Sequence, residues 1–181
     1  MATIDVIVAV NAGELVKQVN SGNLSAGTQS APTNLGSWGS SDVFIAMISE
    51  NEFTTDDKGG SELKITAEQG DTIKWSMTSF GRNVNHTAYI YASHFNPANA
   101  LEDVSYDLIN TTQYLPAGSN PLVTPSPYHN QVVYKASAAV ITSTDVNVQY
   151  TLSFALIDNA TGAAVGYFMW DPFINVASSA E

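Results

Sequence analysis

The clearest pattern in the chain is the segment Val146–Ile157, which reads VNVQYTLSFALI. Apolar side chains occupy every even position, and small or polar side chains occupy nearly every odd position. A period of two residues indicates a β-strand with one buried face, because successive side chains of a strand point to opposite sides. A turn cluster, DNATG (158–162), and a second apolar run, AAVGYFMW (163–170), follow directly. Together these segments predict a β-hairpin.

Further segments alternate in the same way or are rich in β-branched residues, which favours strands. The predicted strands are 4–10, 43–48, 61–67, 72–77, 88–92, 104–112 and 131–141. We expect strands 61–67 and 72–77 to form a hairpin across the turn at 68–70. One short helix is expected over 12–19, with Asn11 as its N-cap.

Two stretches lack a strand pattern. Residues 21–41 are rich in Gly, Ser, Asn and Thr and predict a long loop. The segment 116–128 contains four prolines, which exclude a central strand because each proline removes a backbone donor; they are Pro116, Pro121, Pro125 and Pro127. The whole pattern predicts one domain, 1–181, folded as a two-sheet antiparallel β-sandwich that is jelly-roll-like or immunoglobulin-like. An up-and-down barrel is the alternative.

The composition restricts the class of partner. The chain has 181 residues, of which 44% are hydrophobic, enough for a core. Only 13% are charged, with six Lys and Arg against 17 Asp and Glu, and the formal net charge is -11. So few cations cannot form a basic patch, so we expect neither nucleic acid nor an anionic membrane as a partner. The absence of cysteine excludes disulfides and thiolate chemistry.

The location expected from the sequence is the cytoplasm. The first residues, MATID, show neither the basic nor the apolar region of a signal peptide. No apolar run is long enough to span a bilayer. Export by a route that needs no signal remains the alternative.

Motifs for catalysis are missing. The sequence contains no Gly-x-Ser-x-Gly elbow, phosphate-binding loop or dinucleotide fingerprint. The three histidines, His86, His94 and His129, do not have the spacing of zinc ligands, and we expect them at exposed loops or strand ends. We therefore predict a protein that is not an enzyme and assign no catalytic residue.

Two groups of residues are candidates for binding. Trp38 and Tyr128 are aromatic residues in predicted loops, and an aromatic face can stack on a sugar ring; His129 and Asn130 adjoin Tyr128. The alternative for Trp38 is packing within its own loop. Calcium takes oxygen ligands from loops, and the candidate ligands are two acidic pairs, Asp56 with Asp57 and Glu102 with Asp103. Their alternative is that of solvated carboxylates, in which case no cofactor is present.

Three sequence blocks carry a resemblance to a known family. They are IDVIVAV (4–10), GDTIKW (70–75) and GYFMWDPFI (166–174). In order and spacing the chain resembles the AidA/PixA family of bacterial inclusion-body proteins. The resemblance implies an all-β, non-enzymatic bacterial protein, of a kind that forms intracellular inclusions and is in some members controlled by cell density or linked to a host. Only four methionines are present, so a methionine-storage role has no support.

The blocks also contain residues that we interpret as structural. Pro172 fixes its own φ and favours an extended Asp171, whose carboxylate is then expected to accept hydrogen bonds from backbone donors of a neighbouring loop. Trp170 and Phe173 are predicted to be buried. The full structural set is Gly70, Asp71, Trp75, Tyr167, Trp170, Asp171, Pro172 and Phe173.

Two functions from different classes remain open. The first is a β-sandwich that self-associates as a homo-oligomer and accumulates in inclusions. The second is a carbohydrate-binding module or lectin, with calcium as a candidate aid. The two are compatible, because a multimeric lectin gains avidity from repeated weak sites.

Overall fold

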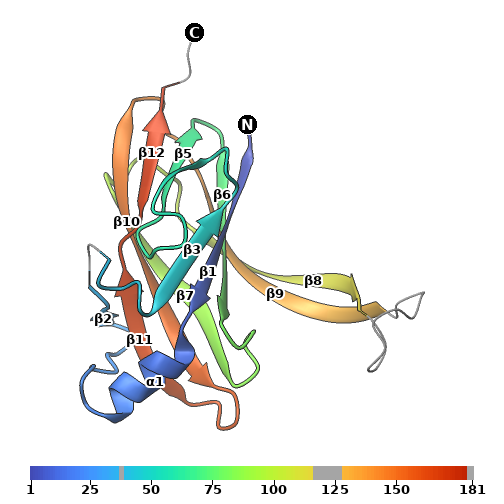
Figure 1. Cartoon of the computed structure of the whole chain (residues 1–181). Helices are drawn as coiled ribbons and strands as arrows, with labels where there is room; N and C mark the ends of the chain where they lie inside the picture. Colours follow the sequence, from blue (N-terminus) through green and yellow to red (C-terminus); the bar gives the residue numbers. More distant parts are fainter. Residues whose placement is uncertain (37–38, 116–127, 179–181) are drawn as a thin grey trace.

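The computed structural model describes residues 1–36, 39–115 and 128–178. In these ranges the chain forms two β-sheets that share one hydrophobic core, together with a short helix (Figure 1). The predicted all-β sandwich is therefore confirmed. Each sheet ends in edge strands, so neither closes into the barrel that was the alternative.

The first sheet has five strands in the order β3-β1-β6-β9-β8. Within β1 the even-numbered residues are buried and the odd-numbered ones are exposed or half-buried, because a strand has a period of two. The strand bounds are β1 Thr3–Val10, β3 Ile45–Ser49, β6 Thr72–Ser79, β8 Ser105–Tyr114 and β9 Tyr128–Ala139.

The second sheet has seven strands and is built around the long strand β10. One edge of β10 pairs with β7, and the other edge pairs with β12 and then with β11. β2 extends the sheet beyond β11, and β5 and β4 extend it beyond β12. The bounds are β2 Thr33–Asn34, β4 Thr54–Asp56, β5 Lys64–Glu68, β7 His86–Asn96, β10 Val146–Asp158, β11 Ala164–Trp170 and β12 Phe173–Ala177.

Both sheets are mixed, whereas the sequence predicted antiparallel ones. Three strand pairs run parallel: β1 with β6, β12 with β5, and β11 with β2. Alternating hydrophobicity reports which face of a strand is buried, but it carries no information about the direction of the neighbouring strand. The sequence pattern therefore predicted the layers and missed the parallel pairs.

The hairpin predicted over 146–170 is confirmed. β10 and β11 pair antiparallel, with Leu152 opposite Trp170. β12 continues along β10 in the same register, with Gln149 opposite Phe173. Asp171 and Pro172 interrupt the strand between them, and Pro172 has no backbone N–H to contribute to the sheet. Its carbonyl still accepts a hydrogen bond from the Tyr150 N–H (3.0 Å).

The predicted hairpin between 61–67 and 72–77 is wrong. β5 belongs to the second sheet and β6 to the first, so the turn between them carries the chain across the sandwich. Asp71 holds this crossing: its Oδ1 accepts from the Ala2 N–H (2.6 Å) and its Oδ2 from the Glu68 N–H (3.0 Å). Gly70 precedes it with φ +89°, a conformation that favours glycine.

The expected helix is present as α1, Ala12–Asn20. Asn11 caps it, because its Oδ1 accepts from the Glu14 N–H (3.2 Å). Leu15 is fully buried and joins the core. Within the described ranges, no helix has the length and apolar character that a membrane crossing requires.

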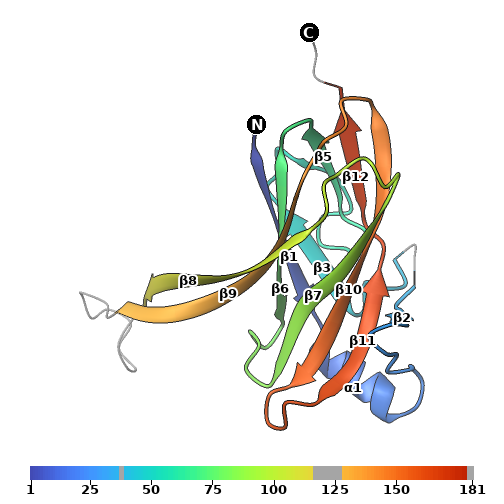
Figure 2. The ribbon, with the colours of Figure 1, turned by 180° about the vertical axis from the view of Figure 1, so that it is seen from behind.

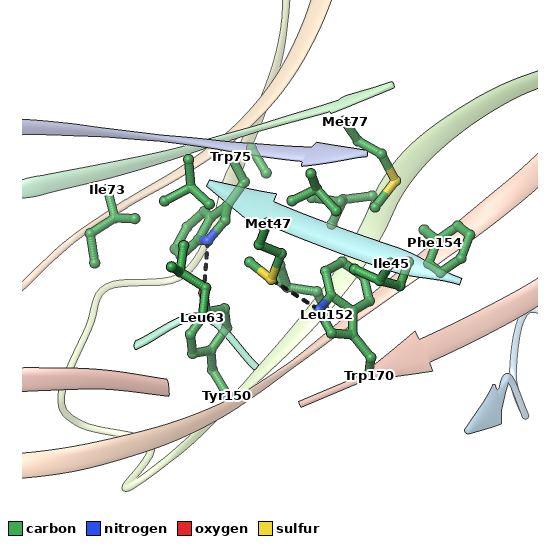
Figure 3. Packing of buried hydrophobic residues seen from close by; sticks show 14 of the residues in the cluster. Ile45, Met47, Leu63, Ile73, Trp75, Met77, Tyr150, Leu152, Phe154 and Trp170 are labelled. Atoms are coloured by element: carbon green, nitrogen blue, oxygen red, sulfur yellow. Dashed lines mark hydrogen bonds between the residues drawn. The ribbon is translucent and has the colours of Figure 1, made fainter. Parts of the chain in front are cut away.

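Two tryptophans link the sheets through the core (Figure 3). The Trp75 indole N–H in β6 donates to the Tyr150 hydroxyl in β10 (3.2 Å), and the Trp170 N–H in β11 approaches the Met47 sulfur in β3 (3.2 Å). Both indole rings are fully buried. Each N–H therefore meets its acceptor in the opposite sheet, which fixes how the two layers face each other.

One part of the first sheet leaves the sandwich. β9 pairs with β6 only through residues 135–139, and beyond Lys135 it continues with β8 alone. Figures 1 and 2 show β8 and β9 projecting sideways as a two-stranded ribbon. We call residues 105–114 and 128–137 the β8–β9 arm. The four prolines of the sequence prediction lie between its strands, outside the described residues.

Candidate functional site

The β8–β9 arm has two chemically different faces. Its strands pair antiparallel from Ser105 opposite Ser137 to Tyr114 opposite Tyr128. Paired residues of an antiparallel ribbon point to the same side. Even-numbered residues therefore form one side, which continues the buried side that carries Ala136 and Ala138. We call this the apolar face; it comprises Tyr106, Leu108, Asn110, Thr112, Tyr114, Tyr128, Asn130, Val132, Tyr134 and Ala136.

Large apolar side chains of this face are open to solvent. Leu108 is 72% exposed, Tyr114 71% and Tyr128 66%. Val132 is 59% exposed, whereas Ala136 at the base of the arm is buried. Exposure therefore rises along the ribbon as it leaves the sandwich, although the chemical character of the face stays apolar.

Aromatic contacts fix the base of the arm to the second sheet. The Tyr134 ring meets Tyr89 of β7 edge-on, with 5.8 Å between centroids, and stacks with Tyr106 at 6.3 Å. Burial raises the pKa of Tyr106 and of Tyr134, and for Tyr106 a hydrogen bond with Ser93 of β7 opposes part of this effect. The base is thus held against the body, and the outer part is not.

A cavity of about 1000 Å³ lies where the arm leaves the body. Met77 and Thr78 of β6 line one side, where β6 and β9 have separated, and residues 129–134 of β9 line the other. β7 contributes Thr87, Ala88 and Tyr89. We call it the corner cavity. Its remaining walls come from exposed polar and apolar side chains, namely Ile7, Ser76, Arg82, Asn83, Val84, Gln113 and Leu115.

The arm is nearly free of charge. Its two strands contain one acidic and one basic residue, Asp107 and Lys135, which lie directly opposite each other in the register. Both have odd numbers and belong to the polar face. The apolar face carries no charged side chain at all, although the whole chain has a net charge of -11.

The predicted ligand residues fall in two places. Tyr128, His129 and Asn130 begin β9, so they form part of the arm rather than the loop that the sequence predicted. His129 and Asn130 line the corner cavity, and Tyr128 lies near the outer end of the apolar face. Trp38 lies outside the described residues.

The acidic pairs predicted for calcium lie apart in the fold. Asp56 and Asp57 line a smaller cavity of about 490 Å³ together with Glu62 and Lys64. The Asp57 carboxylate accepts from the Glu62 N–H (3.0 Å), so it already serves a turn. The other pair, Glu102 and Asp103, does not line that cavity. Among residues 1–36, 39–115 and 128–178, no group of three or more His, Asp or Glu side chains is placed to hold a metal ion.

The structural motif residues occupy the core and its edges. Trp170 is fully buried and Pro172 is buried, but Phe173 is only half-buried, with the Lys64 ammonium 5.8 Å from its ring centroid. Tyr167 is half-buried and meets Tyr91 edge-on at 5.9 Å.

Asp171 differs from its predicted role. Its Oδ2 accepts from the side-chain amide of Gln149 (2.8 Å), and among the described residues its buried Oδ1 has no partner. Burial raises the pKa of this carboxyl, against the opposing effect of the Gln149 hydrogen bond.

This geometry suits contact rather than turnover. The corner cavity presents amides, one imidazole and one guanidinium beside tyrosine rings, and the arm presents an uncharged apolar surface. Sequence analysis identified Tyr128, His129 and Asn130 but missed the apolar face. The signal was the even-numbered pattern of Tyr106, Leu108, Val132 and Tyr134, which looks like an ordinary buried strand face.

Fold and site together define an all-β sandwich protein with a projecting two-stranded arm. Residues 2–176 match the family model described as PixA, inclusion body protein. The chain therefore belongs to the PixA inclusion body protein family.

Known structures agree on the fold. The crystal structure of the inclusion body protein PixA from Burkholderia cenocepacia J2315 matches with a TM-score of 0.75 and 17% identity, over 97% of this chain and 96% of that one. The solution structure of amebosin gives a TM-score of 0.28 at 12% identity, over 70% and 92% of the two chains. A multicopper oxidase from Campylobacter jejuni gives 0.34 at 9%, over 98% and 30%. No curated protein matched the sequence.

Proposed function

We propose that this chain is a non-enzymatic protein that self-associates and accumulates in intracellular inclusions. Membership of the PixA inclusion body protein family supports the class. The observation that carries self-association is the β8–β9 arm, whose apolar side chains have no cover in a single copy within the described residues. Neither nucleic acid nor a membrane is part of the proposal.

Light scattering over a series of concentrations tests this function. One copy has a mass of 19.3 kDa, and we expect at least twice that mass, rising with concentration. Imaging of the native host should show inclusions that contain the protein. A mass of one copy at every concentration, together with cells free of inclusions, would contradict the proposal. Control by cell density or by a host, which the family resemblance implies, is tested by protein abundance through growth.

Carbohydrate binding is a second candidate, supported by the lining of the corner cavity. The amides of Asn83, Asn130 and Gln131 lie there beside the rings of Tyr89 and Tyr134. Sugars are bound by such combinations, because amides exchange hydrogen bonds with hydroxyls and aromatic faces cover C–H groups.

A glycan array with calcium and with chelator tests this second function. Binding that Asn130→Ala weakens would support the corner cavity as the sugar site. Loss of binding in chelator would support calcium at Asp56 and Asp57 or at Glu102 and Asp103. An array without binding under both conditions would contradict the second function and leave the first unaffected.

A further inference from the structure

The apolar face of the β8–β9 arm continues the core beyond the point where the sandwich ends. Ala136 and Ala138 of β9 are buried against the second sheet. Further out on the same side, Leu108 and Val132 remain apolar although 72% and 59% of their surface is exposed. The sequence thus keeps a core-like face where one copy of the chain supplies no opposing layer among its described residues.

An isolated two-stranded ribbon is only marginally stable in water, and it requires packing on one face to persist. A contiguous apolar patch on a soluble protein also marks an interaction site. Of the aromatic contacts in the arm, those of Tyr106 and Tyr134 lie at its base, so they do not cover the outer half. Both considerations indicate that the outer half packs against another surface.

We propose that this surface is the apolar face of a second copy of the same chain, packed face to face about a two-fold axis. The inference rests on the proposed function and adds the interface through which self-association occurs. In such an arrangement the two arms form a small sandwich, and each supplies the layer that the other lacks.

Charge favours a second copy as the occupant. Two copies of a chain with net charge -11 repel each other, and this repulsion is smallest where both surfaces are neutral. The apolar face has no charged residue, and the only opposite pair of the arm, Asp107 and Lys135, lies on the other face. A strongly charged partner would find no complementary group on this face.

The size of the face also fits a dimer. Ten residue pairs at a rise of about 3.4 Å give a ribbon about 34 Å long. Two such faces packed together bury on the order of 1,000 Å², which is the lower bound for a specific interface. The corner cavity, which Val132 and Tyr134 line, leaves room beside the arm for side chains of the second copy.

The test uses full-length variants that place one charge on either face of the arm. Leu108→Glu and Val132→Glu put a carboxylate on the apolar face, and both sites are exposed, so the single copy should still fold. Ile109→Glu is the matched control, because it is the neighbouring residue, is also exposed at 37%, and points to the polar face. Melting curves of all three variants verify that each is folded.

Light scattering and sedimentation then measure self-association. We expect Leu108→Glu and Val132→Glu to raise the dissociation constant of the dimer at least about tenfold, because like charges meet across the interface. Ile109→Glu should associate like the original chain. Mixing Leu108→Glu with Leu108→Lys should restore the dimer, since opposite charges then meet only if the face packs on itself.

Each other result overturns the inference, and the results separate it from the proposed function. If Leu108→Glu and Val132→Glu associate like the original chain, copies meet through another surface, and self-association stands without this interface. If Ile109→Glu weakens association equally, or if the mixture does not recover, the face-to-face arrangement is wrong. If the original chain remains at 19.3 kDa throughout, both the inference and the proposed function fail.

Discussion

Two indole nitrogens show how single residues join the layers of the sandwich. Trp75 and Trp170 are fully buried, and each N–H meets an acceptor in the opposite sheet. A buried donor without a partner loses its hydration and gains nothing in return. The conserved geometry of the sandwich at this point therefore depends on two acceptors, the Tyr150 hydroxyl and the Met47 sulfur (Figure 3).

Replacing Tyr150 with Phe should lower the free energy of unfolding. The change keeps the ring but leaves the Trp75 N–H buried without its acceptor, and such a loss costs about 1–3 kcal/mol. Urea unfolding followed by tryptophan fluorescence measures the effect. Tyr91→Phe is the control, because its hydroxyl donates to the Gln29 carbonyl at an exposed position and should contribute less. Equal unfolding midpoints for Tyr150→Phe and the original chain would contradict the prediction.

Asp171 should make stability depend on pH. Burial raises its folded-state pKa, so folding favours the protonated carboxyl. This contribution is complete below the unfolded pKa of the carboxyl and is lost as the pH rises through the raised folded pKa. Asp171→Asn keeps an acceptor for Gln149 and removes the charge. The melting temperature of Asp171→Asn relative to the original chain should therefore rise between about pH 3 and about pH 7.

A difference in melting temperature that stays constant over this pH range would contradict the role given to the Asp171 carboxyl. Asp171→Ala provides a second comparison. It also removes the acceptor of the Gln149 amide, and we expect it to lower the melting temperature of the protein.

At the scale of elements, β11 depends on a residue without a side chain. A Cβ at Gly166 would lie 2.5 Å from the Phe168 ring and 2.7 Å from the Ala26 carbonyl oxygen. Gly166→Ala should therefore separate β11 from the segment at Ala26 and destabilise the protein by about 1–3 kcal/mol. Gly13→Ala in α1 is the control, because its Cβ has space and alanine favours helices. Thermal unfolding that ranks Gly166→Ala at or above Gly13→Ala would contradict this account.

The elements also show what a sequence pattern can predict. The hairpin of β10 and β11 was predictable because a turn cluster and two alternating runs are adjacent in the chain. β5 and β6 have equally clear alternation, but each has one buried face because it borders the core from opposite sheets. Alternation does not say which sheet a strand joins, so the hairpin predicted there was wrong.

The candidate site was harder to predict for the same kind of reason. Asp107 and Asn110 weaken the strand pattern of 104–112, since both sides of the arm are reached by water. Tyr128, His129 and Asn130 were identified by their chemistry, but the preceding prolines suggested a loop. Only the three-dimensional arrangement shows that β9 separates from β6 after Lys135 and that its core-like face continues outside the sandwich.

At the scale of the whole molecule, the β8–β9 arm makes the chain unlike a closed sandwich (Figure 2). The body is acidic and its core is complete, whereas the arm is neutral and its apolar face is uncovered among the described residues. These two properties together account for a protein that remains soluble as a charged body and associates through one uncharged projection.

Hydrogen exchange at two protein concentrations tests this central claim most directly. Peptides covering β8 and residues 128–137 of β9 should exchange slowly at high concentration and faster on dilution, because packing of two apolar faces stabilises both ribbons. Peptides from β1 and β10 in the core should exchange at the same rate at both concentrations. Equal exchange of the arm at both concentrations, in samples that light scattering shows to be oligomeric when concentrated, would contradict the account.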